Sequence, residues 1–327
     1  MTGPPPGARR SWWRRFLSWG VLAATGVFIV RYVVTHRADF DVLGDLTVAA
    51  LVAMVAASML YLVPQAYRYQ IVLERQSGRA IGYWLWFRLF VVGQFLNMFL
   101  SQAGNVYRSL RLKRLTGVTI TAYVGGYMAF TWLAITSNLV AAIAVVGIVD
   151  VGLTVADVPV VPVVTAVAAL VAAAPFVAAW SLGRLRLERG GIERTRKRVH
   201  DVVRASVAIP SSPGFMWRFL GSSLATYVAT LAVVAVAFAG LGTRVSAAEV
   251  AVFTALLQVG NVINVTPGNL GLQEVGFGAL AEGIGVGAAT GLLASGLLRI
   301  TSFIALAITA AVARLADTRT EAHAGTD

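Results

Sequence analysis

Long stretches of this chain lack charged residues, and this pattern restricts the fold more than any other feature. Charged residues make up 13% of the 327 positions and hydrophobic residues 57%, whereas soluble domains carry about 25% charged residues. A helix that crosses a bilayer needs about 20 consecutive apolar residues. We therefore predict an all-α integral membrane protein. Its apolar runs lie near 16–34, 46–64, 82–101, 119–149, 158–182, 215–241, 248–265, 270–286 and 288–313.

The net charge of +12 comes from Arg and Lys residues that lie mainly between these runs. A nucleic-acid partner is one interpretation of such a basic chain. In a membrane protein, the same charge is explained by the positive-inside rule and by attraction to anionic lipid. We expect no nucleic-acid partner, because no soluble domain is present to read a groove.

The charges between the runs predict how the first half crosses the membrane. The basic tail 1–15 is predicted to be cytoplasmic, as are the loop containing Arg68 and Arg75 and the basic stretch 105–118. Two cytoplasmic loops cannot flank one full crossing. The segment between them, about 82–104, is therefore predicted to be a re-entrant helical hairpin, buried among other helices.

The second half follows the same rule with the opposite orientation. Span 158–182 is predicted to return to a basic cytoplasmic loop, 183–214, and the tail 315–327 is also predicted to be cytoplasmic. Residues 248–286 then form a second re-entrant hairpin. The sequence predicts six full transmembrane helices and two hairpins in a plasma-membrane protein. They form an inverted-topology repeat, 16–149 and 150–314, an architecture typical of transporters.

Both predicted hairpins contain the same amide-rich phrase. "QFLNMFLSQAGN" and "QVGNVINVTPGN" each read Gln, two residues, Asn, six residues and Gly-Asn. Broken helices leave backbone groups unpaired inside the membrane, so they require protein, water or ligand partners. We predict that the two phrases form hairpin tips that meet near the midplane. Their candidate residues are Gln94, Asn97, Gly104, Asn105, Gln258, Asn261, Asn264, Pro267, Gly268 and Asn269.

These tips are suited to an anionic lipid headgroup. Asn105 and Asn269 can cap the helices that follow them, and helix N-termini attract phosphate or carboxylate. Arg108 and Arg111 add two guanidinium groups to the first tip. Helix capping and hydrogen bonding between helices is the alternative role of the amides.

Arg299 lies near the centre of the last apolar run, where an ionisable residue indicates a functional site. Glu274 is the acid closest to the second tip and is the predicted partner of Arg299. The pair is interpreted either as a gate for a substrate or as a structural ion pair. Cysteine is absent and the three histidines are widely separated, so we expect no metal site and no cofactor.

Two segments resemble signatures of a known family. "NMFLSQAGNVYRSLRLKRLTGVT" and "NVINVTPGNLGLQEVGFGAL" are similar to the two signatures of the lysylphosphatidylglycerol synthase/flippase transmembrane-domain family. The resemblance extends over roughly 15–315. It carries roles to these positions: Asn97, Gly104 and Arg108, then Pro267, Gly268, Gly271 and Glu274, and finally Arg299. Asn105 departs from the family pattern, which usually has Glu there, and Gln102-Ala103 replaces a Pro-Gly pair.

The resemblance implies a flippase-like transporter that moves a phospholipid or glycolipid between leaflets. Two-domain relatives also carry a cytosolic domain that transfers an amino acid to lipid. Only a short tail follows the last apolar run, so we do not expect this polypeptide to be an enzyme by itself. The alternative is a membrane subunit that presents a lipid-linked substrate to a separately encoded partner, such as a transferase.

Overall fold

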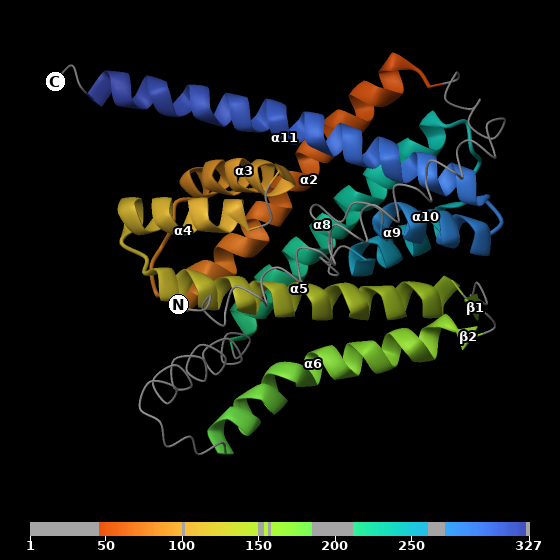
Figure 1. Ribbon diagram of the computed structural model, residues 1–327, viewed down its shortest axis with the longest axis horizontal. Helices are drawn as coiled ribbons and strands as arrows, with labels where there is room; N and C mark the ends of the chain where they lie inside the picture. Colours follow the sequence, from red (N-terminus) through yellow and green to blue (C-terminus); the bar gives the residue numbers. More distant parts are fainter. Residues whose placement is uncertain are drawn as a thin grey trace, which may run out of the picture.

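The protein is a bundle of α-helices in the computed structural model, which describes residues 46–99, 102–149, 154–155, 158–184, 212–260 and 272–324. Most helices run along the longest axis of the molecule (Figure 1). Between α5 and α6, two strands of two residues each pair antiparallel. The described elements are α2 (Val48–Ser77), α3 (Tyr83–Phe99), α4 (Ala103–Thr116), α5 (Ile120–Val149), β1 (Thr154–Val155), β2 (Val158–Pro159), α6 (Val160–Arg184), α8 (Pro213–Gly240), α9 (Ala247–Gly260), α10 (Leu272–Gly283) and α11 (Ala288–Ala324).

Four helices are long and apolar enough to cross a membrane. These are α2, α5, α8 and α11, each with at least 28 residues in its candidate span. At a rise of about 1.5 Å per residue, each exceeds the bilayer core of about 30 Å. Helix α6 lies where the span 158–182 was predicted. The predicted tail 1–15, the span 16–34 and most of the loop 183–214 lie outside the described residues.

Helix α2 continues well beyond the apolar run that predicted it. Its N-terminus is capped by Thr47. It ends at Ser77 and is followed by Gly78, whose φ of 65° is the left-handed conformation that glycine adopts readily. The prediction that Arg68 and Arg75 lie in a loop is therefore wrong, because both residues belong to α2. The prediction from loop charge placed Arg68 outside the helices. The residue is instead buried between helices and forms a hydrogen bond to Ser223 of α8.

The first hairpin is formed by α3 and α4, which pack side by side. Its returning arm is α4, so the basic stretch 105–118 is mainly helix and was wrongly predicted to be a loop. Gly104 in α4 allows the close packing, because a Cβ atom there would clash with the carbonyl oxygen of Gly93 in α3. Arg79, just before α3, donates a hydrogen bond to the carbonyl oxygen of Thr116 at the end of α4, at 3.0 Å. The hairpin thus begins and ends at the same end of the bundle.

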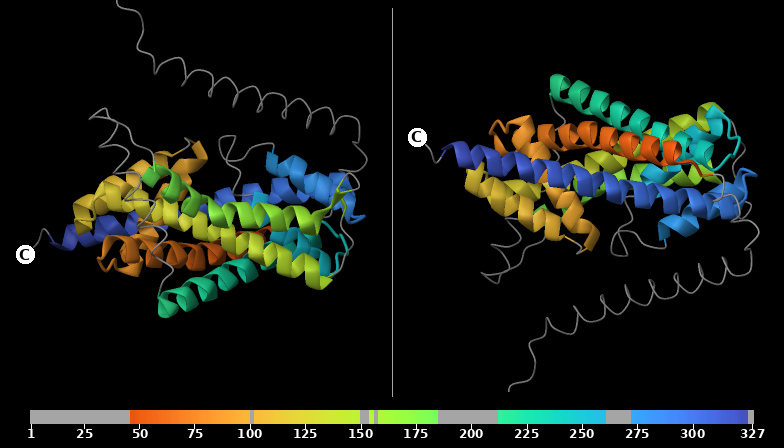
Figure 2. Two further views of the ribbon diagram at one scale, coloured as in Figure 1. Left: turned by 90° about the horizontal axis from the view of Figure 1, so that it is seen from below. Right: turned by 90° about the horizontal axis from the view of Figure 1, so that it is seen from above.

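The second hairpin has α9 and α10 as its arms, which also contact each other. The segment that joins them, 261–271, lies outside the described residues. Figure 1 places α3 and α4 toward one end of the long axis and α9 and α10 toward the other, and both views in Figure 2 agree. The two pairs of short helices therefore occupy opposite ends of the bundle.

Contacts between the two halves follow a reciprocal pattern. Helix α2 of the first half and α8 of the second make the most extensive contact in the bundle. Helix α11 of the second half packs against α3, and α5 of the first half packs against α9. Each half thus supports the hairpin of the other. A buried cluster around Met54 of α2 and Phe238 of α8 joins α2 to α8–α11.

Candidate functional site

A cavity of about 490 Å³ lies where the two halves of the chain meet. Its walls come from α2 and α3 of the first half and from α8, α9, α10 and α11 of the second. Most lining side chains are apolar, including Met98, Val233 and Leu257. The polar and charged side chains that line it are Ser58, Tyr61, Thr230, Gln273, Arg299 and Ser302.

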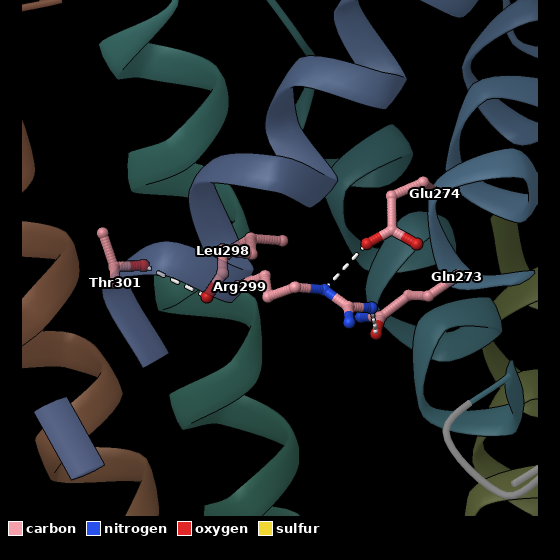
Figure 3. A network of polar contacts seen from close by, with 5 residues as sticks. All are labelled: Gln273, Glu274, Leu298, Arg299 and Thr301. Atoms are coloured by element: carbon pink, nitrogen blue, oxygen red, sulfur yellow. Dashed lines mark hydrogen bonds and ion pairs between the residues drawn. The ribbon is translucent and has the colours of Figure 1, made fainter. Parts of the chain in front are cut away.

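Arg299 and Glu274 form an ion pair beside this cavity, as the sequence predicted. Arg299 Nε lies 2.7 Å from Glu274 Oε1, and the two side chains are 21% and 11% exposed. Arg299 Nη2 also donates to Gln273 Oε1 at 3.3 Å. Figure 3 shows the arginine extending from α11 to the start of α10, where both acceptors lie. A charge at this depth is costly in hydrocarbon unless it is paired, so the carboxylate makes the burial of Arg299 possible.

Close helix packing holds the two partners in position. Gln273 and Glu274 lie in the first turn of α10, which begins at Leu272. Gly291 lets α11 approach α10, because a Cβ atom at this position would lie 2.4 Å from the carbonyl oxygen of Phe277. Gly291 was not predicted as a site residue, because nothing in the local sequence separates it from the other glycines of the last span.

Ser58 and Tyr61 bring α2 to the cavity, and neither was predicted as a site residue. Ser58 is 4% exposed, and its Oγ has no hydrogen-bond partner. The signal for them was present in the sequence. Ser58, Tyr61, Gln65 and Arg68 are three or four residues apart, so they follow one face of a helix. This face was not recognised, because the predicted span 46–64 ended before Arg68.

Gln258 joins the second hairpin to the wall of the cavity. Its Nε2 donates to Thr230 Oγ1 at 2.9 Å, and Asn138 of α5 donates to its carbonyl oxygen at 3.2 Å. The neighbouring Leu257 lines the cavity directly. Gln258 therefore supports the site through Thr230, and α5 holds α9 in place. Outside the described residues lie the predicted site residues Asn261, Asn264, Pro267, Gly268, Asn269 and Gly271.

The polar residues of the first tip bond mainly to one another. Asn97 Oδ1 accepts a hydrogen bond from the Gly104 N–H at 2.7 Å. Arg108 Nη2 donates to Asn105 Oδ1 at 2.9 Å, and Tyr123 donates to the same oxygen at 3.1 Å. These bonds lock α3, α4 and α5 together. Four predicted site residues are absent from the cavity lining: Asn97, Gly104, Asn105 and Arg108.

Two other predicted residues of this hairpin are also absent from the lining. Gln94 is half-buried in α3, and Arg111 is on the exposed face of α4. The end of α3 instead contributes Met98 and Phe99 to the cavity. The first hairpin thus meets the cavity through apolar side chains. The predicted capping role of Asn105 is wrong, because α4 already begins at Ala103, and Asn105 instead accepts hydrogen bonds from Arg108 and Tyr123.

Arg68 and Arg108 are also buried, and each guanidinium group contacts an aromatic ring. Arg108 lies 5.7 Å from the ring centre of Tyr69, and Arg68 lies 5.5 Å from that of Phe130. The two rings stack on each other at 4.4 Å. Cation–π contacts of this kind are worth about 2 kcal/mol or more when desolvated. They hold both cations outside the cavity lining.

Within the described part of the chain, no three His, Cys, Asp or Glu residues are grouped so as to hold a metal ion. In a comparison with protein families, the model described as lysylphosphatidylglycerol synthase TM region matches residues 14–310. No match was found among curated proteins or among solved structures.

Proposed function

The chain belongs to the lysylphosphatidylglycerol synthase transmembrane-region family, and from this premise we propose that it is a flippase-like lipid transporter. A polar headgroup passes through the interior of the bundle while the acyl chains remain in the bilayer. The chain is proposed to carry out this step without chemical conversion of the lipid. It lies in the plasma membrane with both termini in the cytoplasm.

The observation that carries the proposal is the cavity between the two halves, with its ion pair. An apolar wall interrupted by a few converging polar groups is the usual form of a small-molecule site. An ionisable residue inside a membrane indicates a pathway for polar groups. Arg299 combines both features, because it lines the cavity and is paired with Glu274 at 2.7 Å.

The arrangement of the hairpins supports alternating access. They lie at opposite ends of the bundle (Figure 1) and each packs against the last long helix of the other half. Transporters with inverted repeats place their substrate between such elements and expose it to each side in turn. We propose that α3–α4 and α9–α10 are re-entrant and that the repeats are inverted, with six full spans in the whole chain.

The lining also offers a route for the acyl chains. Phe99 of α3 and Phe303 of α11 line the cavity, and they are 59% and 38% exposed. Their ring centres are 5.9 Å apart. These two rings give the cavity an apolar border between α3 and α11. A lipid can keep its tails there while its headgroup occupies the cavity.

Leaflet-specific labelling of lipids in reconstituted vesicles tests this function. The purified chain is expected to move a labelled headgroup between leaflets, and Arg299→Gln is expected to lose this activity. Arg314→Gln is the matched control, since it removes the same charge from an exposed position of α11. Equal translocation by the parent and Arg299→Gln would contradict the proposed role of the pair.

The same assay separates the proposal from its alternative. Absence of translocation by the parent alone would favour a membrane subunit that presents a lipid-linked substrate to a partner enzyme. In that case a labelled lipid should still bind the cavity, and its turnover should require the separately encoded partner. Binding without any flip by the isolated protein would therefore overturn the transporter proposal.

A further inference from the structure

The cavity contains a buried hydroxyl group that no neighbouring residue satisfies. Ser58 lines the cavity. The residue is 4% exposed, and its buried Oγ has no hydrogen-bond partner. A buried polar group without a partner is destabilising, and such groups in native proteins require an explanation. A ligand hydroxyl or carbonyl in the cavity would supply the missing partner.

The charge in the cavity wall is already balanced. Arg299 is the only charged residue of the described lining, and Glu274 pairs with it at 2.7 Å. An anionic headgroup that approached the guanidinium would also approach this carboxylate, so attraction and repulsion would largely cancel. The pair therefore gives an anion little advantage over a neutral group that forms hydrogen bonds.

The remaining polar groups of the lining suit neutral hydroxyl groups. The Thr230 hydroxyl already donates to the carbonyl oxygen of Thr226 and accepts from Gln258. Ser58, Tyr61 and Ser302 contribute further hydroxyls, and Gln273 contributes an amide whose oxygen accepts from Arg299. A hydroxyl both donates and accepts, so these groups can match the alternating donors and acceptors of a polyol. The volume of about 490 Å³ lies within the range of roughly 300–1,000 Å³ found for small-molecule sites.

We propose that the cavity receives an uncharged, hydroxyl-rich lipid headgroup of the sugar type, with Ser58 as a direct hydrogen-bonding residue. This inference rests on the proposed function, because it assigns the substrate class of the same site. The sequence had favoured an anionic headgroup through Arg108. That residue bonds to Asn105 and lies outside the cavity lining, so the positive charge it carries does not select the occupant.

Lipid retention by the purified full-length chain tests the inference without requiring transport. Native mass spectrometry would compare monoglucosyldiacylglycerol, phosphatidylglycerol and phosphatidylcholine with the same acyl chains. The neutral glycolipid is expected to be retained most strongly. Stronger retention of phosphatidylglycerol would overturn the inference, because that lipid has hydroxyl groups but a net negative charge.

Substitution of Ser58 locates the interaction. Ser58→Ala is expected to weaken glycolipid binding by roughly threefold to tenfold, the effect of one lost hydrogen bond, and Ser58→Thr is expected to restore it. Ser222→Ala is the matched control, because Ser222 is buried in α8 but bonds to the carbonyl oxygen of Phe219. Thermal unfolding of each variant shows that it is folded. Equal binding by the Ser58→Ala variant and the parent would overturn the role of Ser58.

The vesicle assay distinguishes failure of this inference from failure of the proposed function. Translocation of phosphatidylglycerol but not of the glycolipid would leave the transporter proposal intact and overturn the substrate class. Retention of the glycolipid in a Ser58-dependent manner, without translocation of any lipid, would support the cavity's specificity and overturn transport.

Discussion

Removing both partners of the Arg299–Glu274 pair is expected to be less damaging than removing one. Glu274→Leu leaves the guanidinium in the membrane interior without its carboxylate, and Arg299→Met does the reverse. The double variant replaces the pair with apolar side chains of similar volume. Such replacements of buried ion pairs are often neutral, whereas breaking a pair leaves an uncompensated charge.

The structure sets the expected magnitude. Breaking a fully buried pair costs about 3–5 kcal/mol. The Arg299 and Glu274 side chains are 21% and 11% exposed. Arg299 also donates a hydrogen bond to Gln273, and we expect this bond to remain in the Glu274→Leu variant. We therefore expect each single variant to lose about 2–4 kcal/mol of unfolding free energy. The double variant should lie within about 1 kcal/mol of the parent, which corresponds to a coupling of about 3 kcal/mol or more.

Equilibrium unfolding in bicelles, carried out on the parent and the three variants, measures this cycle. Additive losses in the double variant would refute the reasoning, because they would show that the two side chains do not depend on each other. The same proteins also separate the two interpretations of the pair. A stable double variant that no longer moves lipid would assign the pair to transport, whereas a stable and active one would make it purely structural.

Two further predictions concern the packing and the orientation of the hairpins. Gly291→Ala should cost about 1–3 kcal/mol of unfolding free energy, because its Cβ would lie 2.4 Å from the Phe277 carbonyl oxygen. Gly296→Ala on the same helix has open space and should be neutral or stabilising. Equal unfolding midpoints of the two variants would contradict this prediction. The chain has no cysteine, so Arg75→Cys and Arg114→Cys should both react with a membrane-impermeant reagent from the cytoplasmic side, and labelling from opposite sides would exclude a re-entrant first hairpin.

Local patterns in the sequence identified the main class of structure. A chain with apolar runs of membrane-spanning length must satisfy its backbone internally, and helices do this without help from distant segments. The same locality explains why Glu274 and Arg299 were found: an isolated charge in an apolar run requires a partner wherever the run packs. The family could also be inferred, because its signatures are short and continuous.

Apart from the Arg299–Glu274 pair, only the tertiary structure decided which polar side chains meet. Arg68 was assigned to a loop because it follows the apolar run 46–64 and was grouped with Arg75. Its contacts with Ser223 and the ring of Phe130 come from α8 and α5. Asn97 and Arg108 were predicted to line a headgroup path, and their hydrogen bonds instead lie within the first hairpin. Ser58 reaches the cavity because α2 packs against α8. The sequence by itself determined where helices form, since that depends on neighbouring residues; helix packing determined the walls of the cavity, since it brings together residues far apart in the chain.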